Sequence, residues 1–223
     1  MTGVFRVYTK DLLPLYLFVC ILFIMGVVFG ALLVNSLTPQ QKHDVGQYVN
    51  TFLAGYGGQA ADAGNAAAAR PAAAEAATGD VWDAFGAHAR WVFFIWILGL
   101  SVVGVPLILL LDFLKGVLIG FTVGYLAGQW SWDGIVFAIV SVAPQNLVVV
   151  PSIIVCSVAA ISFSMALVRN RLMNRSGTVK QPFAAFSLTA LLLVGLMLAV
   201  SLFEVYVSPG LLEWAAPMLR DAV

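Results

Sequence analysis

The sequence predicts an all-α integral membrane protein with five membrane-spanning helices. Of its 223 residues, 61% are hydrophobic and only 10% are charged, and the mean hydropathy is +0.97. Soluble domains carry about 25% charged residues, so the lipid bilayer is the expected surroundings of most of the chain. No basic tail or patch indicates nucleic acid as a partner.

Five apolar segments have the length of a membrane crossing, which takes about 20 residues. The predicted spans are 12–34, 91–111, 113–130, 135–167 and 183–203. The fourth contains no charge, and as one straight helix it would extend about 50 Å, further than a hydrocarbon core of about 30 Å. Because Pro144 and Pro151 interrupt it, we expect this span to be broken or re-entrant near 144–151.

The segment 35–90 forms a long loop after the first span. Thr38-Pro39-Gln40-Gln41 is typical of a helix N-terminus, with an N-cap, a proline at the first position and a capping-box glutamine. It predicts an amphipathic helix over 39–54, whose apolar side chains face the membrane surface, a partner or the protein's own helices. These side chains are Val45, Tyr48, Val49 and Phe52. Residues 60–77 are low in complexity, so their deletion should be tolerated.

The distribution of charge predicts the orientation in the cell membrane. With a cytoplasmic N-terminus and five crossings, seven of the eleven basic residues and two of the eleven acidic residues lie inside. Basic residues concentrate on the cytoplasmic side of membrane proteins. The sequence therefore favours an N-in, C-out arrangement, with loop 35–90 outside.

Glycines recur at every fourth position of the third span, at Gly116, Gly120, Gly124 and Gly128. In a helix this spacing lines up one face without side chains, against which another backbone can pack closely. Gly26 and Gly30 repeat the spacing in the first span. We predict that these glycines pack helices together; a sliding or pore-lining face is the alternative.

The remaining polar residues of the apolar segments are few. Pro144, Gln145 and Asn146 are expected to face inward, toward the glycines, because amides are unfavourable in lipid. Asp112 and Lys115 are interpreted as a pair at the membrane edge. No Asp, Glu or His is expected deep in a span, and no HExxH, GxSxG, P-loop or CxxC motif occurs. The sequence therefore predicts neither catalytic residues nor a metal or cofactor site.

Four stretches of the chain resemble one known family. They are MGVVFGALLVNSL at 25–37, FIWILGLSVVGVPLILLLDFLKGVLIGFTVGYL at 94–126, VSVAPQNLVVVPSIIV at 140–155 and AISFS at 160–164. The patterns LGxSVxGxPxxLLxxFLKGxxxGFTVG and SVxPQNL within them are long, and together they are similar to stage II sporulation protein M. The resemblance covers nearly all the predicted spans, in order.

This resemblance implies a non-enzymatic protein of endospore-forming bacteria, on the mother-cell side of the asymmetric septum. It implies a role in septal thinning and engulfment, in complex with the peptidoglycan-degrading stage II sporulation proteins D and P. We therefore expect a membrane scaffold that localises these enzymes. The residues alone leave open a small channel or transporter lined by Gln145 and Asn146, and also a homo-oligomer.

Overall fold

The computed structural model describes residues 2–56, 81–101, 103–173, 180–208 and 210–211. These ranges contain helices and short turns, with no strand among them. The predicted all-α class is thus confirmed. The low-complexity stretch 60–77 lies outside the described residues, and for some helical residues, including 2–11 and 48–56, only the backbone is described.

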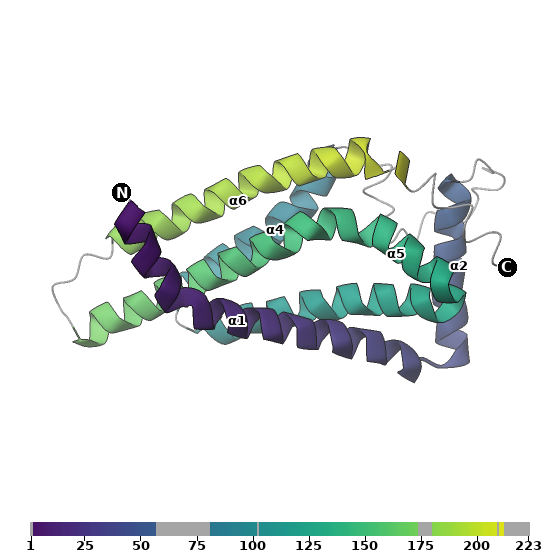
Figure 1. The fold of residues 1–223 in the computed structure, drawn as a ribbon, viewed down its shortest axis with the longest axis horizontal. Coiled ribbons are helices and arrows are strands. Elements are labelled where there is room, and N and C mark those ends of the chain that lie inside the picture. Colours follow the sequence, from purple (N-terminus) through teal and green to yellow (C-terminus); the bar gives the residue numbers. More distant parts are fainter. Residues whose placement is uncertain (1, 57–80, 102, 174–179, 209, 212–223) are drawn as a thin grey trace.

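The helices run along one long axis, except for one that lies across an end of the bundle (Figure 1). In chain order they are α1 (Thr2–Leu33), the 3-10 turn η1 (Val34–Ser36), α2 (Pro39–Tyr56), α4 (Val81–Gly99), α5 (Gly104–Met173) and α6 (Lys180–Tyr206). The helix that lies across is α2, and we call the end where it lies the α2 end.

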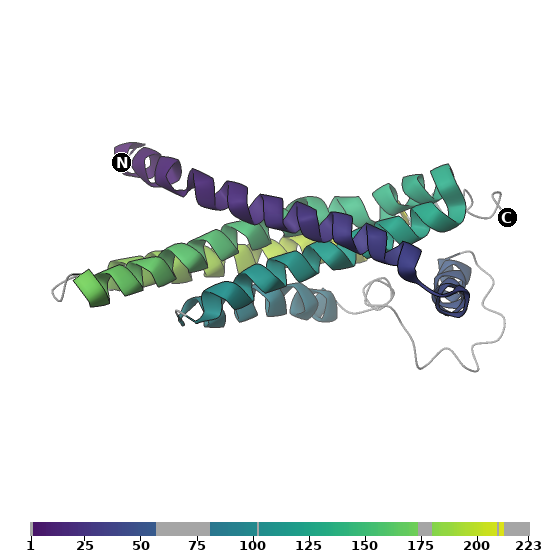
Figure 2. The same ribbon diagram turned by 90° about the horizontal axis from the view of Figure 1, so that it is seen from below.

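Helix α5 folds back on itself. A straight helix would separate Asp112 from Ser157 by about 67 Å, yet the Ser157 hydroxyl donates a hydrogen bond of 2.8 Å to Asp112 Oδ1. The reversal lies at the α2 end (Figures 1 and 2), between two apolar stretches, Gly104–Gln129 and Gly134–Val168. We call these stretches the first arm and the returning arm. The reversal agrees with the predicted turn between the third and fourth spans.

Four helical segments in the described part of the chain are long and apolar enough to cross a membrane. They are Leu12–Ser36, the two arms of α5, and Pro182–Tyr206. The second predicted span, 91–111, is not a single helix, because α4 ends at Gly99 and α5 begins at Gly104. The turn therefore comes earlier than predicted, near 100–103 instead of at Asp112. Pro106 falls in the first turn of α5, where the missing N–H has no helical partner to lose.

The predicted break near 144–151 is wrong. Helix α5 continues through both Pro144 and Pro151, and the returning arm bends there without interruption (Figure 1). A proline removes one helical hydrogen bond and pushes against the preceding turn, which bends a helix. Within a helix bundle this is tolerated because neighbouring groups satisfy the freed carbonyls.

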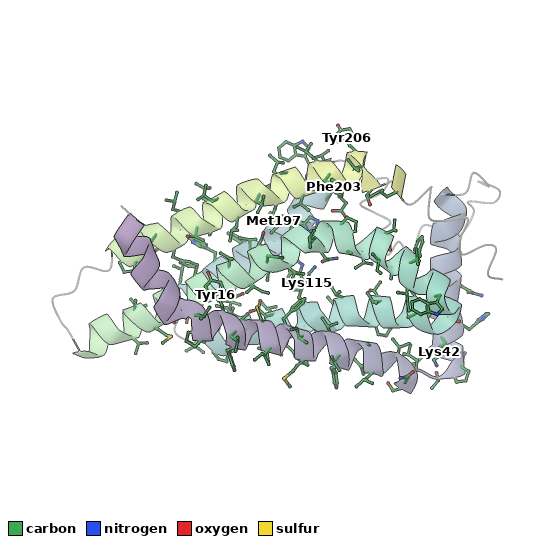
Figure 3. The ribbon with its side chains drawn as sticks, in the orientation of Figure 1. Tyr16, Lys42, Lys115, Met197, Phe203 and Tyr206 are labelled. Atoms are coloured by element: carbon green, nitrogen blue, oxygen red, sulfur yellow. The ribbon has the colours of Figure 1, made fainter. Side chains whose placement is uncertain are left out.

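The returning arm is the centre of the bundle. Of its most apolar window, 56% of the residues are buried, against 22% for each of the other three candidate crossings. Val149, Ile153, Cys156 and Val158 of this arm belong to the core together with Ile95 of α4. On α6, Met197 points into the bundle whereas Tyr206 points away from it (Figure 3). The outer faces are apolar, as expected of helices in contact with lipid.

Candidate functional site

The glycines of α1 and of the first arm lie at one helix–helix contact. A Cβ on Gly120 would lie 2.6 Å from the carbonyl carbon of Val27, and one on Gly124 would lie 2.8 Å from Cα of Ala31. On the α1 side, a Cβ on Gly30 would lie 2.8 Å from N of Phe121. At these positions a side chain would collide with backbone. The numbers of the contacting residues rise together, so α1 and the first arm run parallel.

The other predicted packing glycines do not all share this contact. Gly26 and Gly116 approach each other across the same interface, with a Cβ on Gly26 placed 3.3 Å from Cα of Gly116. Gly128, in contrast, has open space beside it. The close glycine contact therefore ends at Gly124, about one helical turn before the first arm ends at Gln129. Beyond Gly124 the first arm no longer packs closely on α1, since α1 ends at Leu33.

Two glycines that sequence reasoning missed mark the turn between α4 and α5. A Cβ on Gly99 would lie 2.7 Å from Cβ of Ala160, and one on Gly104 would lie 2.6 Å from the carbonyl carbon of Leu98. Both positions need the absence of a side chain. Two glycines around a short Ser-containing stretch, followed closely by Pro106, are a turn signal that could have located this boundary.

Helix α2 begins with the predicted capping box. The backbone N–H of Thr38 donates to Oε1 of Gln41 at 3.0 Å, and the Gln41 N–H donates to Oγ1 of Thr38 at 3.4 Å. These two bonds satisfy backbone donors that the first turn of a helix leaves free. The start of α2 at Pro39 is therefore fixed by local bonds, six residues after the end of α1 at Leu33.

A contact with α5 holds α2 across the end of the bundle. The hydroxyl of Tyr125, a buried residue on the first arm, donates a hydrogen bond of 2.8 Å to the carbonyl oxygen of Lys42. Gly46 allows this approach, since a Cβ there would lie 3.2 Å from the same hydroxyl. Of the four residues predicted to face a partner, Val45 is half-buried. The side chains of Tyr48, Val49 and Phe52 lie outside the described part of the structure.

A pocket of about 460 Å³ opens between α2 and the first arm. Lys42, His43 and Gly46 line it on the α2 side, and Tyr125 and Gln129 line it on the α5 side. Its walls carry hydrogen-bonding groups of both kinds, donors and acceptors. This junction therefore combines a polar pocket with α2, a helix that lies outside the apolar segments.

Asp112 and Lys115 were predicted to form a pair between two spans, but both lie inside the apolar stretch Gly104–Gln129 and do not form an ion pair among the described residues. Asp112 is eight residues inside α5, about 12 Å along its axis, and is 1% exposed. Nζ of Lys115 lies 5.3 Å from the ring centroid of Trp91 on α4, a cation–π arrangement. Figure 3 shows Lys115 in the interior of the bundle. The expectation that no carboxylate lies deep in a span is therefore wrong for Asp112.

A second buried carboxylate joins α4 to α6. Nε2 of His88 lies 2.7 Å from Oε2 of Glu204, with the two side chains 13% and 9% exposed. Among the described residues, this is the one contact within 4 Å between a basic and an acidic side chain. It ties two helices near the α2 end, and Glu204 also interacts electrostatically with Lys115. Sequence spacing gave no signal of it, because the two residues are 116 positions apart.

The amide of Asn146 is used within its own helix. Nδ2 donates to the carbonyl oxygen of Val142 at 2.8 Å, and Gln145 and Pro144 beside it are half-buried. Ser141 and Ser152 bond to backbone in the same way, four residues back. Such bonds let polar side chains sit in an apolar helix without another partner. The geometry therefore gives the Asn146 amide a hydrogen bond within its own helix.

The comparison with protein families gives a match over most of the chain. The family model described as stage II sporulation protein M matches residues 19–209, which is most of the chain. The chain belongs to the stage II sporulation protein M family. The match runs from within α1 to just beyond α6, so it includes the α1–α5 contact, α2 and the buried carboxylates. No curated protein and no solved structure matches the chain. Family membership indicates a sporulation-related membrane protein.

Proposed function

We propose that this protein is a non-enzymatic scaffold of the cell membrane that positions peptidoglycan-degrading enzymes during sporulation. The proposed partners are stage II sporulation proteins D and P, at the mother-cell side of the septum. The observation that carries the proposal is the position of α2 across the end of the bundle, linked to the first arm by the hydrogen bond from Tyr125 to Lys42. A helix that lies across the end of the bundle offers a surface beside the membrane.

The charge distribution supports the direction in which this surface faces. With the N-terminus inside, α1 carries the chain outward, so α2 lies on the side of the cell wall. In this arrangement α4 is an additional, shorter crossing, the second along the chain. The exposed side chains of the α2 N-terminal half, including Gln40 and Asp44, then face the enzymes that cut the wall.

Copurification tests the proposal. Full-length protein extracted from sporulating cells in mild detergent should bring down both hydrolases, identified by mass spectrometry. Deleting 38–56 should abolish their recovery, and deleting 60–77 should not. Tyr125→Phe removes one hydrogen bond to α2, worth about 1 kcal/mol, and should reduce recovery several-fold while the spans stay folded. Folded protein that recovers neither hydrolase, or recovers both without 38–56, would refute the proposal.

A further inference from the structure

The carboxylate of Asp112 is only half satisfied. Oδ1 accepts the hydrogen bond of Ser157, but Oδ2 is buried and has no hydrogen-bond partner. No ion pair within 4 Å involves Asp112 in the part of the chain that the structure describes. The nearest basic residue on the same helix is Lys115, whose ammonium group lies over Trp91. An acceptor therefore points into the centre of the bundle without a donor or cation.

A negative charge on the Asp112 carboxylate would need to be neutralised in this apolar interior. Removing a carboxylate from water without a counter-charge is strongly unfavourable, so buried carboxylates are paired, coordinate a cation or take up a proton. Other ionisable groups lie on α5 itself and on the helices α1, α4 and α6 that pack against it. They are Cys156 beside Ser157 on the returning arm, Tyr16 of α1 in the same core, Lys115 on the first arm, and Glu204 with His88 on α6 and α4. The two basic groups in this set already have partners: Lys115 contacts Trp91, and His88 contacts Glu204.

We propose that Asp112, together with the hydroxyl of Ser157, binds a small cation in the interior of the bundle, either a proton or an alkali-metal ion. A proton needs only the free oxygen. A metal ion needs several oxygen ligands, of which the described side chains supply the Asp112 carboxylate and Ser157. The geometry thus favours the proton.

The site would make the packing of α5 depend on cation occupancy. The bond between Ser157 and Asp112 joins the returning arm to the first arm. With the cation bound, both arms meet at a neutral polar contact. Without it, a charge stands in an apolar interface, which favours water entry and separation of the arms. This property is independent of the hydrolases proposed above, and its test does not involve them.

Infrared spectroscopy of the purified full-length protein in lipid bilayers tests the inference. At neutral pH, exposed carboxyl groups are ionised, so a C=O band of a protonated carboxyl reports a buried acid. We expect such a band in the wild type and its loss in Asp112→Asn. Ser157→Ala should shift the band, because it removes the hydrogen bond but keeps the acid. Ser164→Ala, which alters another buried serine of the same arm, should leave it in place.

A second measurement tests whether the bound cation is an alkali-metal ion. If no such band is present, the thermal unfolding midpoint is compared in sodium, potassium and choline chloride. A rise that is specific to sodium or potassium and absent in Asp112→Asn would assign the site to that ion. If Asp112→Asn does not fold, Ser157→Ala is the deciding variant in both the infrared and the thermal unfolding measurements. A wild type with neither the band nor an ion-specific rise, or a band that is unchanged in Asp112→Asn or Ser157→Ala, would overturn the proposal.

Discussion

Gly120→Leu is expected to destabilise the fold strongly and to lower the yield of folded protein. The first atom of the new side chain would lie 2.6 Å from the carbonyl carbon and 2.7 Å from Cα of Val27, and backbone cannot rotate away as a side chain can. The whole of α1 would have to move from α5, and the contact between these two helices is the most extensive one between described elements. Overpacking costs about 1–3 kcal/mol or more, and we expect a loss of about 3 kcal/mol here. Size-exclusion chromatography and thermal unfolding in detergent measure it.

Gly128→Leu is the matched control for this substitution. Gly128 lies on the same helix, at the same four-residue spacing, and has no neighbouring atom within 4 Å of the new Cβ. Its replacement should leave the yield of monodisperse protein and the unfolding midpoint close to those of the wild type. If Gly120→Leu and Gly128→Leu behave alike, close packing of α1 on α5 does not stabilise this fold.

Breaking the contact between His88 and Glu204 is expected to have the second large effect. The two side chains meet at 2.7 Å and are almost fully buried. A hydrogen bond to a charged group contributes about 1.5–3 kcal/mol, and His88→Leu would also leave the Glu204 carboxylate buried without it. We expect His88→Leu to lower the free energy of unfolding by about 2–3 kcal/mol. Denaturant unfolding in mixed micelles provides the measurement.

A double-mutant cycle separates this contact from general damage to α4. His88→Leu and Glu204→Gln, alone and together, should show a coupling energy of about 1–3 kcal/mol. Asp83→Asn changes an exposed residue in the first turn of the same helix and should change stability little. Additive effects of the two substitutions would mean that the contact does not join α4 to α6.

Local patterns in the sequence predicted local structure well. The capping box at Thr38, the start of α2 at Pro39 and the reversal between the arms of α5 depend on neighbouring residues and on the length of apolar runs. The glycine spacing predicted a face for close approach, but it did not identify α1 as the helix on the other side. That choice depends on the packing of the whole bundle.

The predictions that failed concern contacts between distant residues. Asp112 was interpreted as a boundary because charges in membrane proteins usually lie at the ends of spans. Its hydrogen bond comes from Ser157, 45 positions later, which no local pattern reveals. Pro144 and Pro151 suggested a break because a proline removes a helical hydrogen bond and usually ends or kinks a helix. The helix continues because the surrounding bundle supports the bend, and a single segment of sequence carries no information on that support.

The most direct test of the scaffold account is photo-crosslinking in sporulating cells. A photoreactive amino acid replaces Asp44, which is exposed on α2, or Leu191, which is 68% exposed on the outer face of α6. The account predicts that the probe at position 44 captures one or both wall hydrolases, identified by mass spectrometry, and that the probe at position 191 captures less of them. Hydrolases captured from position 191 but not from position 44 would contradict the claim that α2 is the surface that receives them.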